Sequence, residues 1–273
     1  MPYIGIASLY LAGGLTIFSI VTGFLALRDK KKSLERFARG ASAFSAATIA
    51  LATFSLLTSF LRNEFRIAYV ARNSARSLPV IYKISALWAG QSGSLLLWLF
   101  IISLLVFAIH QMSKYRRGNL DIQLSLVINP VRLLFLVLLL FVSSPFELLA
   151  DPPYNGSGLN PMLQSLGMVF HPPLLFVGFS GFLIPFAFGV VGLWTKDEEG
   201  TWLARIRPWV LFSWAFLTAG IVTGGRWAYT ELGWGGYWAW DPVENASLFP
   251  WLTGTALLHM AFLSKQHRSK KLW

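Results

Sequence analysis

The sequence contains no cysteine among its 273 residues. It therefore has no structural disulfide, no thiolate metal site and no cysteine nucleophile. Charged residues are also scarce, at 13% of the chain, where soluble domains carry roughly 25%. Because 55% of the residues are apolar and the mean hydropathy is +0.56, most of the chain needs an apolar solvent. The sequence therefore predicts an integral membrane protein.

Seven apolar runs reach or approach the roughly 20 residues that a helix needs to cross a bilayer. Backbone groups in lipid must be satisfied internally, so continuous runs of this length are expected to be helices. The first run has no basic region before it, which argues against a cleavable signal peptide. We predict an all-α, polytopic membrane helical bundle that forms a single membrane domain over 1–273. Its seven transmembrane helices are expected at roughly 4–27, 40–61, 93–111, 126–146, 170–194, 209–224 and 245–264.

The net charge of +11 arises from 23 Lys and Arg residues against 12 Asp and Glu residues. Basic loops tend to remain on the cytoplasmic or matrix side of a membrane. The alternate loops 62–92, 147–169 and 225–244 hold only six of the basic residues, whereas sixteen lie in 28–39, 112–121, 195–208 and 265–273. This bias predicts an N-terminus outside and a C-terminus inside. The basic segments match no nucleic-acid motif, so we expect the lipid bilayer as a partner and no nucleic acid.

The segment 225–251 concentrates aromatic residues and glycines. Five of the chain's twelve tryptophans lie in it: Trp227, Trp234, Trp238, Trp240 and Trp251. An aromatic belt at a membrane interface would explain the rings. It would not explain the glycines between them, which let the backbone turn tightly and approach a ligand closely. Rings spaced in this way could stack on a planar cofactor, so the sequence leaves a belt and a planar-ligand shelf equally open.

The sequence Asp241-Pro242-Val243-Glu244 follows the aromatic rings. A capping residue, a proline at the first helical position and an acid at the third are typical of a helix N-terminus. We therefore expect Asp241 and Glu244 to cap a helix. A catalytic pair of carboxylates is the weaker alternative.

Four histidines are present, and imidazole is a common axial ligand of haem iron. His171 precedes two prolines, which predicts extended chain at the outer mouth of the fifth span. His259 lies within the seventh predicted span, where an ionisable side chain is costly and indicates a functional site. The simpler alternatives are an interfacial loop residue for His171 and a helix-packing residue for His259. We expect His110 to be interfacial and His267 to be solvated.

His171 and His259 are predicted to lie at different depths. His259 follows Pro250 by nine residues, which is roughly 13 Å along a helix, whereas His171 is expected at the surface. The two side chains are therefore not expected to share one iron. Each bound haem would need its second ligand from elsewhere, so this chain would hold half-sites.

Residues 234–247 read Trp-Gly-Gly-Tyr-Trp-Ala-Trp-Asp-Pro-Val-Glu-Asn-Ala-Ser, and they resemble the WWD signature of haem-handling membrane proteins. Their continuation to Trp251 is more similar to the CcmF-type cytochrome c haem lyases than to the haem-delivery protein CcmC or the single-chain synthase CcsA. Residues 159–164 with His171-Pro172-Pro173, and residues 82–98, resemble two external loops of the same family. The resemblance extends over nearly the whole chain.

This resemblance implies a system I cytochrome c maturation protein, located in the bacterial inner membrane or the mitochondrial inner membrane. Such a lyase joins haem vinyl groups to the thiols of a CXXCH motif in apocytochrome c. The resemblance implies that His171 binds an external haem and that His259 binds haem b within the membrane. The external haem would lie over an aromatic surface that comprises Trp227, Trp234, Tyr237, Trp238 and Trp240.

Three departures from the family pattern limit the prediction. Members are commonly more than twice this long, which implies a second lyase subunit or a missing C-terminal half and makes catalysis by this chain alone unexpected. Arg226 stands where an aromatic residue is frequent, and Gln91-Ser92 stands where His-Glu is frequent. Arg226 either pairs with a haem propionate or anchors to lipid headgroups.

The resemblance also implies a haem-delivery protein or chaperone of the maturation system as a partner, beside apocytochrome c. Two alternatives to a lyase subunit remain. One is a haem transporter or chaperone that passes haem on without forming a bond. The other is a structural subunit whose aromatic loop docks a partner protein.

Overall fold

The computed structural model describes residues 1–196, 201–233 and 235–270. The chain forms two compact units, Met1–Ser165 and Leu166–Trp273, which are described separately. Six helices in the described part are long and apolar enough to cross a membrane. The chain is therefore an all-helical, multi-pass membrane protein. The seventh span, the orientation of the termini and a single domain over 1–273 stay predictions.

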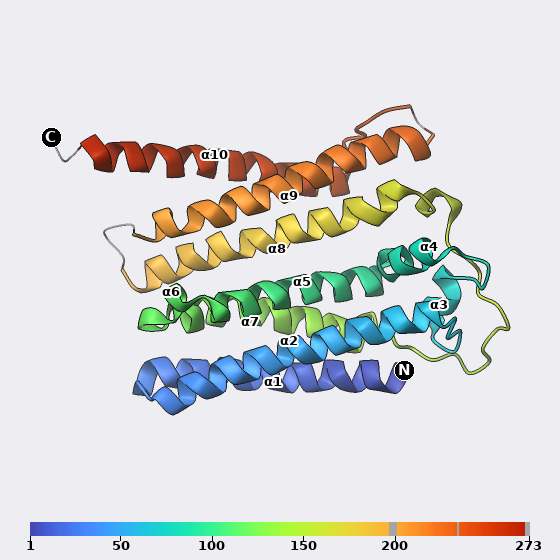
Figure 1. Ribbon diagram of the computed structural model, residues 1–273, viewed down its shortest axis with the longest axis horizontal. Coiled ribbons are helices and arrows are strands. Elements are labelled where there is room, and N and C mark those ends of the chain that lie inside the picture. Colours follow the sequence, from blue (N-terminus) through green and yellow to red (C-terminus); the bar gives the residue numbers. More distant parts are fainter. Residues whose placement is uncertain (197–200, 234, 271–273) are drawn as a thin grey trace. The chain divides into compact units, whose positions relative to one another are not determined.

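The first unit is built on four long helices: α1 (Pro2–Asp29), α2 (Lys32–Leu61), α5 (Gln91–Gln111) and α7 (Leu120–Val137). A π-helical turn, η3 (Leu138–Val142), continues α7. Helix α1 packs against α2 and α7, and α5 packs against the same two helices. The four helices run side by side in Figure 1, so each contributes one face to a shared interior.

Small residues form the interior face of α1. Gly5, Ala12, Gly13 and Gly23 are buried, whereas large apolar side chains such as Phe18 are exposed. Large apolar residues gain nothing by leaving lipid, and small ones let helix backbones approach closely. This inversion of the soluble pattern, with large residues outward, is what a helix surrounded by lipid requires.

Two segments close the end of the first unit where α2 ends and α5 begins. One contains α3 (Ala68–Asn73), α4 (Val80–Ser85) and η1 (Ala86–Trp88), and the other is the loop after η3. They are joined by main-chain hydrogen bonds from Ala68 N to the Glu147 carbonyl and from Leu149 N to the Arg66 carbonyl. Two of the three loops predicted from alternate charge to share one side of the membrane, 62–92 and 147–169, therefore lie together.

Tyr69 fixes the turn that precedes α5. Its hydroxyl accepts a hydrogen bond from Gly90 N at 2.9 Å and lies 3.1 Å from the Leu87 carbonyl oxygen. Burial raises the pKa of this hydroxyl, so it remains protonated and able to donate to that carbonyl. At Gly93 a Cβ atom would lie 1.8 Å from the Leu87 carbonyl oxygen, so the turn requires glycine there.

At the opposite end of the first unit, two short helices, α6 (Ser113–Arg116) and η2 (Arg117–Asn119), connect α5 to α7. Lys30 and Lys31 join α1 to α2 at the same end. Most of the basic residues of this unit lie there or at the start of α2, as the charge bias predicted. His110 was expected to be interfacial, but its side chain is buried, with 3% of its surface exposed. Its ring nitrogens each lie 3.0 Å from a polar partner on α7, Asp121 or Ser125, and these partners explain the burial.

The second unit contains α8 (Leu166–Trp194), α9 (Thr201–Glu231) and α10 (Pro242–Lys270), preceded by the short η4 (Pro161–Leu163) of the first unit. Helix α9 packs against both α8 and α10. These helices extend well beyond the apolar runs. The fifth and sixth predicted spans begin four and eight residues too late. Helix α8 already starts at Leu166, and polar and aromatic residues such as Trp202 and Arg205 continue α9.

Candidate functional site

The aromatic segment forms the connection between α9 and α10. Gly233 and Gly235 have φ angles of +70° and +74°, a left-handed conformation that glycine adopts without steric cost. Trp240 also has a positive φ, +60°, which is strained for a bulky residue and typical of functional sites. Trp234 lies outside the described residues. The glycines therefore act as turn residues, as predicted.

The N-terminus of α10 is capped by Asp241. Its Oδ1 accepts a hydrogen bond from the Glu244 main-chain N–H at 2.7 Å, and Pro242 occupies the first helical position. The Glu244 carboxylate accepts from the Ala239 N–H at 2.7 Å, which fixes the main chain of the aromatic segment. Capping therefore accounts for both carboxylates, although Glu244 reaches two residues further back than a capping box predicts.

Two adjoining hollows lie between α9, the aromatic segment and α10. The first has a volume of about 340 Å³ and is lined by Thr218, Ile221, Val222, Trp238, Trp240, Leu248 and Trp251. The second, of about 550 Å³, is lined by Ile221, Val222, Gly225, Arg226, Tyr229, Thr230, Tyr237 and Trp238. Both fall within the roughly 300 to 1,000 Å³ typical of ligand sites. Trp238 borders both hollows, so together they form one apolar groove.

The rings that border this groove are held in place by one another. Tyr229 and Tyr237 stack with centroids 4.5 Å apart and an interplanar angle of 4°. Trp238 and Trp240 meet edge to face at 6.0 Å. Trp251 Nε1 donates to Thr218 Oγ1 at 2.7 Å, which joins α10 to α9. Tyr237 and Trp240 remain 60% and 70% exposed, so their faces are available to a ligand.

Two polar groups at the groove lack protein partners in the described part of the chain. Trp238 Nε1 is buried and has no hydrogen-bond acceptor, which is costly unless a ligand supplies one. The Arg226 side chain is exposed at the second hollow, and no ion pair to it is present among the described residues. An apolar groove with an unpaired N–H and a guanidinium fits a planar apolar molecule that carries carboxylates, as haem does.

His171 lies within α8, although the two prolines after it predicted extended chain. Its Nδ1 atom lies 2.7 Å from the Gly220 carbonyl oxygen on α9. A carbonyl oxygen only accepts, so Nδ1 carries the proton and the Nε2 atom of the neutral ring keeps its lone pair. This contact holds the turn against α9 and outweighs the pre-proline preference for extended chain. The ring is therefore oriented as metal-binding histidines are.

Helix α9 makes room for His171. At Gly224 a Cβ atom would lie 2.3 Å from the His171 Cε1 atom. Trp227 packs beside the imidazole, with ring centroids 5.9 Å apart, and also fills the space above Gly167. Trp227 lines neither hollow. It packs against His171 from α9, whereas the predicted aromatic residues Tyr237, Trp238 and Trp240 border the groove.

His259 is exposed on α10 and shows the same arrangement as His171. Its Nδ1 atom lies 2.8 Å from the Thr255 carbonyl oxygen, one turn earlier, so its Nε2 atom also keeps a lone pair. No contact between His259 and His171 occurs among the described residues. The two imidazoles are thus separate among the described residues, and their role as haem half-sites stays a prediction. His267 lies in the part of α10 whose side chains are outside the described residues.

A polar stripe on α7 was missed by the sequence reasoning. Asp121, Ser125, Asn129 and Arg132 are all buried, and they recur every three or four residues, which is the period of one helix face. Three of them fall within or just before an apolar run, so the run was assigned as a plain span. The spacing itself was readable, because buried ionisable residues in a span indicate function by default.

Comparison with known proteins shows that the chain belongs to a known family. The family model described as cytochrome C assembly protein matches residues 88–273. The chain is 40% identical over 274 residues to the cytochrome c-type biogenesis protein CcmF of Escherichia coli (strain K12), covering 100% of this chain and 42% of that protein. It is 42% identical over 228 residues to CcmF of Haemophilus influenzae, covering 83% of this chain and 35% of that protein.

The fold agrees with this likeness. A solved structure of the cytochrome c heme lyase CcmF matches with a TM-score of 0.83 at 32% identity, covering 96% of this chain and 42% of that one. The chain thus spans about two fifths of the length of these relatives and corresponds to their N-terminal part.

Proposed function

Because the chain belongs to the cytochrome c assembly protein family, we propose that it is the part of a cytochrome c haem lyase that holds haem during thioether formation. The apolar groove at the start of α10 is the observation that carries this proposal. It combines open aromatic faces, an unpaired Trp238 N–H and a guanidinium. The aromatic faces suit the porphyrin ring, and the two donors suit the carboxylates of haem.

In this proposal each group of the site has one task. Tyr237, Trp238 and Trp240 stack against the porphyrin face. Arg226 binds a propionate carboxylate as a bidentate donor. His171 offers the Nε2 lone pair to the iron from one side, and the second axial ligand comes from outside this chain. Trp234 extends the aromatic surface. His259 is a ligand of a separate haem b within the membrane.

The chemistry belongs to the vinyl groups of the haem and to the thiols of apocytochrome c. Each thiol adds across one vinyl double bond. The sulfur bonds to one vinyl carbon, the thiol proton is transferred to the other, and no group leaves. The chain contains no cysteine, so it cannot compete as a thiol for the same vinyl groups. Its own residues orient the haem and exclude water from one face.

The proposal requires partners beyond this chain. They are a polypeptide corresponding to the remaining three fifths or so of the relatives, a haem-delivery protein and an apocytochrome c with a CXXCH motif. The membrane is the bacterial cytoplasmic membrane or the mitochondrial inner membrane. We propose that the aromatic groove lies on the outer side of this membrane, as the charge bias of the loops predicts.

Coexpression tests the bond-forming step. The chain is produced with a polypeptide that supplies the missing part of a CcmF relative, together with a haem-delivery protein and a CXXCH apocytochrome c. The product is examined by mass spectrometry for haem attached through two thioether bonds. Attached haem that disappears when the chain is omitted supports a lyase subunit. Non-covalent haem transfer without any thioether product contradicts it and assigns a transport role.

A further inference from the structure

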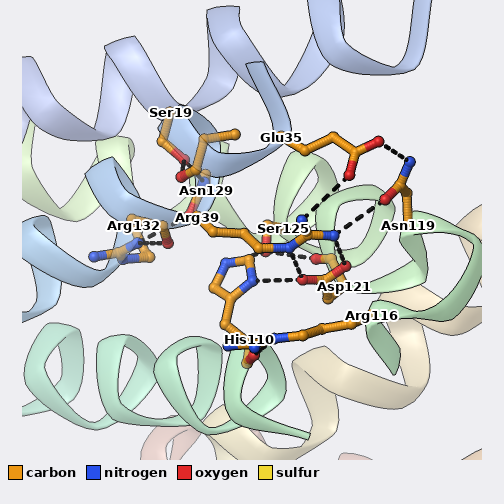
Figure 2. Close-up of polar contacts among 12 residues, drawn as sticks. Ser19, Glu35, Arg39, His110, Arg116, Asn119, Asp121, Ser125, Asn129 and Arg132 are labelled. Carbon is orange, nitrogen blue, oxygen red and sulfur yellow. Dashed lines mark hydrogen bonds and ion pairs between the residues drawn. The ribbon is translucent and has the colours of Figure 1, made fainter. Parts of the chain in front are cut away.

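The polar residues along α7 belong to two clusters, which face α1, α2 and α5. Figure 2 shows Asp121, Ser125 and His110 grouped with Arg39, and Arg132 further along beside Asn129. Asp121, Ser125 and His110 are at most 5% exposed. Both clusters belong to the first unit, far in sequence from the aromatic groove, and the proposed function uses neither.

The Arg132 cluster is held by neutral side chains. Its Nε atom donates to Ser103 Oγ at 3.1 Å and its Nη2 atom to Ser45 Oγ at 2.9 Å. Its Nη1 atom donates to Asn129 Oδ1 at 2.9 Å. Neutral oxygens from α2, α5 and α7 thus solvate this buried cation, and the cluster joins these helices.

The His110 cluster, in contrast, has one unassigned proton. The Asp121 carboxylate accepts from Arg39 Nε at 2.6 Å and from Arg39 Nη2 at 3.0 Å, so it is ionised. His110 Nδ1 lies 3.0 Å from the same carboxylate and must donate to it, because an ionised carboxylate only accepts. The proton on Nδ1 is therefore fixed in every state of the cluster.

The opposite ring nitrogen faces a hydroxyl that has two acceptors. Ser125 Oγ lies 3.0 Å from His110 Nε2 and 2.7 Å from the Asp121 carbonyl oxygen. A hydroxyl has one proton to donate but can also accept. If it donates to Nε2, the ring is neutral. If it donates to the carbonyl, its oxygen accepts from Nε2–H and the ring is an imidazolium. Rotation about one bond satisfies both states.

We propose that His110, Asp121 and Ser125 form a buried proton-binding site in the first unit. The site takes up one proton at His110 Nε2 while the Ser125 hydroxyl turns from the ring to the Asp121 carbonyl. A site of this kind requires a hydrogen-bonding partner for each state, and this cluster supplies both. The proposal does not depend on haem handling.

The surrounding charges fit a site that can exist in both states. Helix α2 contributes Arg39 and Glu35, whose side chains form an ion pair at 3.4 Å. Helix α7 contributes Asp121, and the Arg116 guanidinium of α6 donates to the His110 carbonyl oxygen at 2.6 Å. Helix α1 contributes the neutral Ser19. With a neutral ring, the charges of Arg39 and Arg116 balance those of Asp121 and Glu35, and an imidazolium adds one positive charge that lies beside the Asp121 carboxylate.

The site lies where the basic connections of the first unit meet. His110 is next to the last residue of α5, and Asp121 is the second residue of α7. Proton uptake therefore adds charge at the point where side-chain hydrogen bonds join α2 to α7 and α5 to α7. It couples the pH on that side of the membrane to the packing of these helices.

Nitrogen NMR of the imidazole tests the proposal directly. The full chain, with ¹⁵N in its histidine rings, is placed in lipid nanodiscs and measured from about pH 5 to pH 8, the range in which imidazoles change charge. The sequence contains four histidines, so the spectrum of His110→Gln assigns the resonances. Nδ1 should stay protonated throughout, while Nε2 should gain a proton as the pH falls.

Two variants test the partners of the ring. Ser125→Ala should move the Nε2 resonance and leave the Nδ1 resonance in place. Ser8→Ala is the matched control, because Ser8 donates to the Ile4 carbonyl of its own helix in the same way; it should move neither resonance. Asp121→Asn removes the counter-charge, so the ratio of imidazolium to neutral ring at a given pH should fall at least about tenfold.

The proposal is overturned if His110 keeps one protonation state over the whole pH range in the unchanged protein. It is also overturned if Ser125→Ala leaves the Nε2 resonance unmoved while the chain stays folded. Neither result would affect haem binding at the aromatic groove. The two proposals therefore succeed or fail separately.

Discussion

At the scale of single residues, main-chain carbonyl groups orient the side chains of the two predicted haem ligands. His171 and His259 each direct Nδ1–H to a carbonyl oxygen, at 2.7 Å and 2.8 Å. That bond selects the tautomer with a lone pair on Nε2 and fixes the ring plane, as the second ligand shell of metal sites does. The arrangement depends on small neighbours, because the His171 ring lies against Gly224 with no room for a methyl group.

Gly224→Ala should therefore displace the His171 ring while leaving its imidazole in the chain. We expect haem affinity at the external site to fall by roughly tenfold to a hundredfold, the usual cost of disturbing a hydrogen bond that orients a metal ligand. Absorbance titration with haem measures the change. Gly189→Ala is the control, because a Cβ there meets nothing within 4 Å. Equal affinity in both variants would rule out His171 as a positioned ligand.

At the scale of elements, the aromatic segment is held by the N-terminus of α10. Asp241 caps the helix, and Glu244 reaches back to the Ala239 N–H. The orientation of Trp238 and Trp240 thus follows from where the helix begins. The capping residues were predictable from the sequence, because a helix start is a local signal. The contact of Glu244 with Ala239 was not, since it depends on how the preceding loop folds back.

Asp241→Ala should lower the stability of the N-terminus of α10 by about 1 kcal/mol, the typical cost of losing an N-cap. Hydrogen–deuterium exchange should become faster in the first turn of α10 and in the aromatic segment, and not in α8. Asp151→Ala in an exposed loop is the control. Unchanged exchange in the first turn of α10 would show that the cap does not hold the segment.

At the scale of the whole molecule, composition alone predicted a multi-pass helical protein, because lipid leaves few alternatives to apolar helices. The prediction erred where it equated polar residues with loops. Asp121 and His110 were assigned to a loop and an interface, yet each is buried by partners on other helices. The spacing of the buried polar residues on α7 could be read from the sequence, but their partners on other helices could not. His171 was placed in extended chain for the same reason, since its partner Gly220 is 49 residues away.

The orientation predicted from charge can be tested because the chain has no cysteine of its own. Asp151→Cys and Lys31→Cys place single thiols at exposed positions at opposite ends of the first unit. A membrane-impermeant maleimide added from outside should label Asp151→Cys in intact cells or vesicles. Lys31→Cys should react only after permeabilisation. The reverse pattern would show that the N-terminus lies inside.

The central claim, that this chain supplies histidine ligands to haem, is tested most directly by absorption and pyridine-haemochrome spectra. The chain is purified in detergent with its complementary polypeptide, unchanged and as His259→Ala and His171→Ala. We predict a b-type spectrum in the complex, from which His259→Ala removes the contribution of the membrane haem and His171→Ala that of the externally bound haem. A complex without haem under haem-replete expression would contradict the account and make the aromatic segment a docking surface.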